Sequence, residues 1–299
     1  MKFKQVLNVS IIIIMINLAF VGCSNKDISE NTIKNEDKPI IAVSIVPQKT
    51  FIKAVAGDLV KVITIIPPGN SPANYKPTPK QMISLSDAKI YFTIGVPTEK
   101  ANIIPKLKDI NENIKLIALE DKVSKFYPIR YFNKKVKENK DPHIWLSPKR
   151  VKVMVKEIKN ELINLDPKNK DIYSNNANKY LNELDRLDNE IKKSLSGLKN
   201  NDFITYHPSL GYFSDDYGLN MISIEKSGKE ATTKRLQQII DLARKKEIKY
   251  IFYQKEFDGE QAKTIASEIN GKTIKYNPLS EDYIKNIKNI IITFNEVLN

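Results

Sequence analysis

The chain has 299 residues and carries 48 Lys and Arg against 35 Asp and Glu, which gives a formal net charge of +13 at pH 7. The lysines are spread along the whole sequence without an Arg-rich tract, and this pattern disfavours a nucleic-acid-binding protein, which would gather its basic residues on one face. A single cysteine excludes an intramolecular disulfide and any metal site built from several thiolates.

The N-terminus has the organisation of an export signal. Two lysines precede an apolar stretch, residues 6–21, which ends at Gly22-Cys23 before a polar and charged segment. A basic start, a short apolar region and small residues before a cut are typical of signal peptides. The junction resembles the lipobox of bacterial lipoproteins, although Phe20 stands where Leu is usual. The resemblance implies that residues 1–22 are removed and that Cys23 is lipidated; the alternative is an uncleaved anchor helix.

Residues 23–38 are polar, lack aromatic side chains and have no apolar period, so we predict a flexible tether. Beyond the tether, short β-branched runs alternate with amphipathic segments. Near-continuous apolar runs are typical of parallel strands that are buried on both faces. The predicted strands form two sets, 40–45, 60–66, 90–94 and 114–118, then 203–206, 221–224, 250–253 and 273–276.

Amphipathic helices are predicted at residues 232–246 and 259–269, and this alternation of strands and helices indicates parallel βαβ units. Between the two sets of strands, Ser147-Pro148 and Asp166-Pro167 are typical helix starts. Apolar residues then keep helical spacing to Lys199, which predicts a helix of about 30 residues and about 45 Å. Two ordinary helices joined by a bend are the alternative.

The sequence therefore predicts an α/β fold of two four-stranded parallel lobes. Residues 39–146 form the N-terminal lobe, residues 147–199 the linking helices with one long rigid backbone helix, and residues 200–299 the C-terminal lobe. We expect a ligand cleft between the two lobes.

The chain has only two histidines, and both lie where an α/β protein binds ligands. His207 directly follows a predicted strand, and ligands of such folds bind at the carboxyl ends of the strands. His143 lies in the segment DPHIWLSP at 141–148, beside the only tryptophan. Neutral imidazole is a common ligand of zinc. A structural role for each histidine stays open at this point.

Four spaced segments resemble one family, the zinc and manganese solute-binding lipoproteins of ABC importers. The segments are PPGNSPANYKPTP at 67–79, DPHIWLSP at 141–148, HPSLGYFSDDYGL at 207–219 and GKE at 228–230. The resemblance covers nearly the whole chain after the signal peptide. It implies two α/β lobes joined by a long helix, a metal ion in the cleft and an ABC importer permease as partner.

The resemblance also implies four metal-ligand positions, of which this chain keeps two. The second and third family positions match His143 and His207, and histidine at the third resembles the zinc type. The first position falls on Ala73, which has no donor, and the fourth falls on Asn277, a weak neutral oxygen donor. The His-rich loop of zinc-type members is replaced by Lys-rich residues 120–140.

Other donors are candidates for the missing ligands. Glu256 follows a predicted strand and is a candidate metal ligand, and Glu225 and Glu230 are further candidates. Asn74 and Tyr75 are oxygen donors beside Ala73. Nitrogen ligands favour zinc and oxygen ligands favour manganese. We expect Zn²⁺ as the transported ligand, and leave Mn²⁺ or another divalent metal open.

We therefore expect a monomeric, extracytoplasmic protein, anchored to the cell membrane, that captures zinc for an ABC importer and is not an enzyme. One alternative is an altered cleft that binds a metal chelate or a small non-metal solute. A second is a hydrolase that uses His207, Ser209 and Asp215, although the Gly-x-Ser-x-Gly turn is missing. A third is a surface adhesin that acts in cell adhesion through its basic face.

Overall fold

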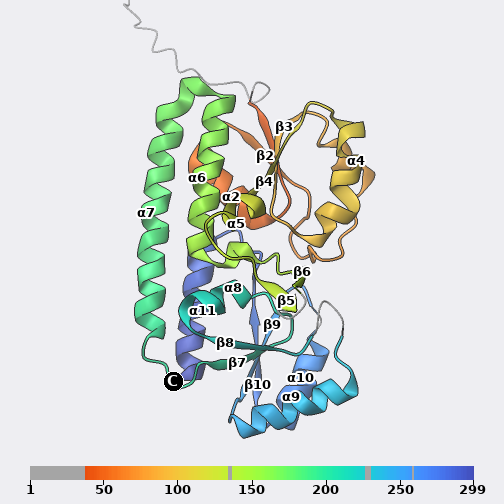
Figure 1. The fold of residues 1–299 in the computed structure, drawn as a ribbon, viewed down its shortest axis with the longest axis vertical. Coiled ribbons are helices and arrows are strands. Elements are labelled where there is room, and N and C mark those ends of the chain that lie inside the picture. The colour runs from red at the N-terminus through yellow and green to blue at the C-terminus, as the bar shows by residue number, and fades with distance from the viewer. Residues whose placement is uncertain (1–37, 134–136, 226–229, 258) are drawn as a thin grey trace, which may run out of the picture. The chain divides into compact units, whose positions relative to one another are not determined.

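Eight parallel strands form two separate four-stranded sheets in the computed structural model, which describes residues 38–133, 137–225, 230–257 and 259–299 (Figure 1). The first sheet has the order β2-β1-β3-β4, with β1 Ile40–Val43, β2 Lys61–Thr64, β3 Ala88–Thr93 and β4 Lys115–Ala118. The second has the order β10-β9-β7-β8, with β7 Asp202–Thr205, β8 Asn220–Ser223, β9 Tyr250–Gln254 and β10 Lys272–Tyr276. The predicted α/β fold of two parallel four-stranded lobes is confirmed.

The two sheets share one topology. In each, the first strand of the lobe pairs on one side with the second strand and on the other side with the third. From the central strand β1 the chain crosses to β2 on one side of the sheet, and from the central strand β3 it crosses to β4 on the other side. The central strands β7 and β9 are connected to β8 and β10 in the same way. Such a switch point opens a crevice at the carboxyl ends of the strands. The topology therefore places one ligand-binding edge in each lobe.

Alternate residues of each central strand pack into different apolar clusters. In β1, Ile41 and Val43 belong to the large core that runs through both lobes, and Ala42 belongs to a smaller cluster on the other face. In β7, Phe203 and Ile204 divide in the same way. Both faces of each sheet are thus buried, which explains the near-continuous apolar runs in the sequence.

Helices cover both sheets, and their bounds lie close to the predicted ones where a helix was predicted. Thr232 caps α9, because its side chain accepts a hydrogen bond from the backbone N–H of Arg235. The helices outside the linker are α2 Val46–Ala56, α3 Pro79–Ile83, the π-helical turn η1 Glu99–Ile103, α4 Ile104–Ile110, α5 Leu119–Ser124, the 3₁₀ turn η2 Ile144–Leu146, α8 Gly211–Tyr217, α9 Thr233–Lys245, α10 Glu260–Glu268 and α11 Tyr283–Leu298.

The linking segment forms two helices, α6 Pro148–Leu165 and α7 Lys170–Leu195. Ser147 caps α6 as predicted, since its hydroxyl accepts from the backbone N–H of Arg150. Asp166-Pro167 instead begins a short 3₁₀ turn, η3 Pro167–Asn169, and α7 starts after it. The long helix has 26 residues and ends before Lys199, so it is shorter than predicted.

Helix α7 runs beside both lobes (Figure 1). It packs against the other linking helix, α6, against α2 of the N-terminal lobe, and against α11 and α8 of the C-terminal lobe. Its buried residues Tyr173, Leu184 and Ile191 belong to the core that also contains Ile41 and Phe203. One apolar core therefore joins the two lobes along the long helix.

The antiparallel pair β5 Tyr131–Asn133 and β6 Glu138–Lys140 was not predicted. Both strands are short and polar, so they lack the apolar runs that identify the eight parallel strands. The predicted signal peptide, Cys23 and the tether up to residue 37 lie outside the described residues.

Candidate metal centre

His143 is held by the turn that follows β6. The carboxylate oxygen Oδ1 of Asp141 accepts from the backbone N–H of His143 at 3.0 Å and lies 2.7 Å from its ring nitrogen Nδ1. The indole of Trp145 packs against the imidazole with 5.1 Å between ring centroids, and its Nε1 donates to the carbonyl of Pro278 at 2.8 Å. These contacts fix the ring orientation and present Nε2.

His207 is held in the same way at the end of β7. Its Nδ1 hydrogen-bonds to the carboxylate of Glu225, and Phe257 stacks on its ring with 5.0 Å between centroids. The backbone carbonyl of His207 accepts from the hydroxyl of Thr205 at 3.1 Å. His207 is 7% exposed, as is His143. Two imidazoles from different lobes are therefore buried, and each is oriented by one carboxylate.

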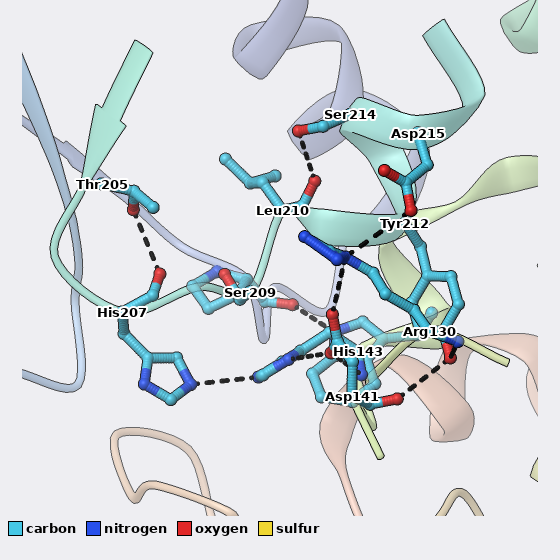
Figure 2. Close-up of polar contacts among 12 residues, drawn as sticks. Arg130, Asp141, His143, Thr205, His207, Ser209, Leu210, Tyr212, Ser214 and Asp215 are labelled. Carbon is cyan, nitrogen blue, oxygen red and sulfur yellow. Dashed lines mark hydrogen bonds and ion pairs between the residues drawn. The ribbon is translucent and has the colours of Figure 1, made fainter. Parts of the chain in front are cut away.

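The two imidazoles meet directly, with 3.3 Å between the Nε2 atoms (Figure 2). A carboxylate only accepts hydrogen bonds, so each Nδ1 carries the proton and each neutral ring has a lone pair on Nε2. The two lone pairs then face each other, and only a cation or a shared proton satisfies both. Two ligands of one tetrahedral zinc lie roughly 3.3 Å apart, because zinc–nitrogen bonds are about 2.0–2.1 Å long.

Burial affects the protonation of His143. Removal from water lowers the pKa of His143, and the nearby Asp141 carboxylate opposes that effect only in part. His143 therefore stays neutral at pH 7. A neutral imidazole is the form that binds a metal ion.

A cavity of about 680 Å³ opens beside the imidazoles. Both lobes contribute to its wall, and the N-terminal switch point supplies Gly95 and Glu99 while the C-terminal one supplies His207 and Gln254. The remaining lining residues are Ser71, Pro72, Ala73, Val96, Pro97, Lys100, Ile104, Glu120, Asp121, Phe132, Asn139, Lys140, Pro142, His143, Trp145, Pro278 and Leu279. The expected cleft between the lobes is thus present.

Ala73 lines this cavity, but Asn277 is not among its lining residues. The side-chain oxygen of Asn277 accepts from the backbone N–H of Leu279 at 3.0 Å, and its carbonyl accepts from Asn286 at 2.7 Å. Asn277 thereby caps its own loop. The structure does not bring its side chain to the imidazole pair.

The acidic candidates lie in three different settings. Glu225 holds Nδ1 of His207 and so orients that ring. Glu256 interacts electrostatically with His207, and burial raises its pKa, but it does not line the cavity. Glu230 is exposed. Among the described residues, no group of three or more His, Cys, Asp or Glu side chains is arranged to hold a metal.

The oxygen donors beside Ala73 also point elsewhere. The hydroxyl of Tyr75 donates to Gln81 at 2.9 Å, and neither Asn74 nor Tyr75 lines the cavity. Ser71 is the oxygen donor of this loop that does line it. The two imidazoles are therefore the donors that the described residues bring together.

The residues named for hydrolysis do not form a catalytic triad. The hydroxyl of Ser209 lies 2.7 Å from that of Tyr276, and Nε2 of His207 faces His143. The carboxylate of Asp215 lies 3.7 Å from Nε of Arg130. A nucleophile, its base and an orienting acid are thus not in contact with one another.

Sequence reasoning missed Asp141 as the residue that orients His143, although the Asp-Pro-His spacing is the signal that identifies it. It also missed Gln254, which ends β9 and is 4% exposed. Its amide nitrogen has no hydrogen-bond partner among the described residues. Gln254 belongs to no recognisable motif, so the sequence alone does not identify it as a residue of the site.

Within the part of the chain that the structure describes, no helix has the length and hydropathy needed to cross a membrane.

Known proteins that are similar to this chain include zinc-uptake and zinc-binding proteins. The chain is 26% identical over 271 residues to the high-affinity zinc uptake system protein ZnuA of Bacillus subtilis, covering 88% of this chain and 85% of that protein. It is 27% identical over 271 residues to the zinc-binding lipoprotein AdcA of Streptococcus pneumoniae, but covers only 53% of that relative, about half its length.

Among solved structures, a crystal structure of a ZnuA deletion mutant with zinc bound has a TM-score of 0.82 and 36% sequence identity, with 88% of this chain and 99% of that chain covered. Residues 41–297 match the family described as the periplasmic component A of the zinc-uptake complex. The match spans both lobes and the linking helices, and the chain belongs to the ZnuA family.

Proposed function

We propose that this chain is an extracytoplasmic solute-binding protein that captures Zn²⁺ between its two lobes and delivers it to an ABC importer. His143 and His207 are the metal ligands in this proposal. The role is capture and release, without chemical conversion of the solute, so the protein is not an enzyme.

The observation that carries the proposal is the pair of Nε2 atoms 3.3 Å apart, each on a ring whose Nδ1 contacts a carboxylate. Histidine ligands of zinc usually donate Nδ1–H to such a partner, which fixes the tautomer and makes the metal-binding nitrogen more basic. Asp141 and Glu225 also place two negative charges next to the two positive charges of the ion.

Zinc is the metal that these donors favour. Imidazole nitrogens suit zinc, copper and nickel, whereas manganese prefers carboxylate and carbonyl oxygens. The described residues bring two nitrogens and no carboxylate to the shared point, because both nearby carboxylates bind the other ring nitrogen. We therefore expect Mn²⁺ to bind more weakly than Zn²⁺.

Anchoring completes the proposal. Lipid on Cys23 holds the protein at the outer side of the cytoplasmic membrane, the tether of residues 23–38 gives it reach, and a membrane permease receives the ion from a monomer.

The test measures zinc content and zinc binding of the full-length chain in mild detergent, by elemental analysis and calorimetry. We expect one saturable zinc site in the wild type, and loss of at least about tenfold in affinity in His143→Ala and in His207→Ala, because either change removes one of the two protein donors. Zinc should also raise the melting temperature of the wild type.

Asn176→Ala is the control, because it removes a polar side chain that donates from α7 to the carbonyl of Val55 at 3.1 Å and does not line the cavity. We expect its zinc affinity to equal that of the wild type. Zinc binding that survives in both histidine variants would refute the assignment of the ligands.

A further inference from the structure

We propose that the cleft binds zinc most tightly together with one small amino-acid-type chelator, which completes the coordination of the ion. This inference rests on the proposed function and names the form of its substrate. Zinc in proteins usually has four ligands. The described residues supply two, so the chelator supplies the other two, one nitrogen and one oxygen, from the cavity side.

At the two family ligand positions that this chain lacks, the described residues place no substitute donor against the imidazoles. Ala73 lines the cavity with a methyl group, and the side chain of Asn277 is engaged within its own loop. Both imidazoles line the same cavity, so the open coordination positions of a shared ion lie toward it. A solute in that space can reach the ion without displacing a protein ligand.

The cavity is the size of a small-molecule site. Its volume of about 680 Å³ greatly exceeds the room that a metal ion and two waters need, since a water in the liquid occupies about 30 Å³. Pockets for small organic ligands are roughly 300–1,000 Å³ and are walled mainly by apolar and aromatic groups. Phe132, Trp145, Ile104 and Leu279 form such walls here.

The charged groups of the cavity include both signs. Lys100 and Lys140 supply ammonium groups, while Glu120 and Asp121 supply carboxyl groups. Glu99 is buried and its pKa is raised to about 8, so it is mostly uncharged at pH 7 and does not repel an anion. A solute that carries both a carboxylate and an amino group matches this mixture.

Gln254 adds a neutral donor to the wall. Gln254 is the last residue of β9, and His207 follows the end of the neighbouring strand β7 by two residues; both line the cavity. The buried amide nitrogen of Gln254 has no hydrogen-bond partner among the described residues. An acceptor oxygen of a bound solute could hydrogen-bond to this amide from the cavity.

The charge of the assembled site is also consistent with a chelated ion. Glu225 and Asp141 lie behind the imidazole rings and offset part of the charge of zinc, although Asp141 also pairs with Arg130. A chelator with one carboxylate then adds one negative charge, which an ammonium group such as that of Lys100 compensates.

The experiment uses L-histidine as the chelator probe and the full-length chain in detergent. The protein is dialysed against radioactive zinc and carbon-labelled L-histidine, at histidine concentrations from zero to a large excess. We expect one histidine to be retained for each zinc, only when zinc is present, and zinc retention that holds or rises as histidine increases. Lys100→Glu should lower histidine retention about tenfold, because it replaces a charge-assisted contact by repulsion.

Lys108→Glu is the matched control, since Lys108 is also exposed, lies in the next helix and does not line the cavity. It should retain histidine as the wild type does. Zinc that binds fully without histidine, and that histidine only strips away, would overturn this inference and leave the proposed function intact. A protein that retains neither zinc nor zinc with histidine would overturn both.

Discussion

Asp141 contacts His143 through one carboxylate oxygen and faces Arg130 through the other. Its Oδ1 lies 2.7 Å from Nδ1 of His143, and its Oδ2 lies 3.4 Å from Nε of Arg130 (Figure 2). Gly211 packs so closely that a Cβ there would lie 2.6 Å from Oδ2 of Asp141. Asp141 is fully buried at its side chain. The carboxylate is therefore fixed on one side by the guanidinium and aims its free lone pair at the imidazole.

Asp141→Asn should weaken zinc binding about 10–100-fold, the usual cost of losing an outer carboxylate partner of a metal-binding histidine. The amide still accepts a hydrogen bond from Nδ1–H of His143, but its negative charge is gone, so the ring becomes a poorer ligand. Calorimetric titration with zinc measures the change. Asp185→Asn, at an exposed carboxylate that pairs with Lys152, is the control and should bind as the wild type does.

Zinc affinity should fall as the pH drops below about 6, because protons compete with the metal for the imidazole nitrogens. Burial lowers the pKa of His143, so that ring takes up its proton at a more acidic pH than the ordinary 6.5. Affinity is therefore expected to be nearly constant from pH 8 to about 6.5. Competition with a chromophoric chelator of known proton affinity checks this, and an affinity independent of pH would exclude imidazole ligation.

A second pH effect comes from Glu99, which accepts hydrogen bonds from the hydroxyl of Ser44 and from the backbone N–H groups of Ile94 and Gly95. Burial raises its pKa from an ordinary 4.5 to about 8. The folded protein thus binds one proton more than the unfolded chain between these values, and the free energy of unfolding should fall as the pH rises through that range.

Glu99→Gln removes this titration, so the melting temperature of the wild type relative to the variant should decrease between about pH 5 and pH 9. The new amide also places a donor near the N–H of Gly95, a cost that is the same at every pH. The test is therefore how the difference in melting temperature between the wild type and the variant changes with pH. Two melting curves that stay parallel across this range would show that Glu99 is ionised in the folded protein.

Much of the fold was predictable because its strands are buried on both faces. Ile40–Val43 and residues 250–253 are continuous apolar runs in the sequence, and Ser147 and Thr232 are residue types that cap helices, as their hydrogen bonds confirm. The pair β5–β6 has no such run and was missed. The start of α7 was misplaced because Pro167 suits a 3₁₀ turn as well as an α-helix.

The site was predictable only where residue type determines the chemistry. His143 and His207 stand out as the sole imidazoles, and their positions at one cleft follow from motif and topology. Asn277 does end a strand as expected, yet strand position does not tell which way a side chain turns, and its oxygen caps the backbone of Leu279. The same limit applies to Glu225, which the sequence suggested as a metal ligand and which instead contacts Nδ1 of His207.

Cys23→Ser should move the protein from the membrane fraction to the soluble extracytoplasmic fraction, because one acylated residue supplies the anchor in our proposal. Fractionation and labelling with a radioactive fatty acid measure the outcome. Cys23→Ala should behave in the same way. A wild-type chain that takes up no labelled fatty acid and keeps residues 1–22 would instead establish the uncleaved anchor helix.

Zinc binding should leave the relative position of the two lobes almost unchanged. Helix α7 packs on α2 in one lobe and on α11 in the other, and one apolar core continues from Ile41 through Tyr173 to Phe203. A wide hinge motion would have to separate these buried side chains, at a cost of about 25 cal/mol for each Å² of apolar surface exposed. We therefore expect the ion to rearrange loops at the cavity wall, near Pro142 and Pro278, and the permease to recognise those loops.

Small-angle X-ray scattering with and without zinc measures this directly. We expect the radius of gyration to change by less than about 1 Å, in the range of complexes whose partners are already organised before binding. His207→Ala, which loses one of the two protein donors, should give the same curve with and without zinc. A decrease of more than about 2 Å on zinc addition to the wild type, absent from that variant, would mean that the lobes close around the ion and that α7 bends.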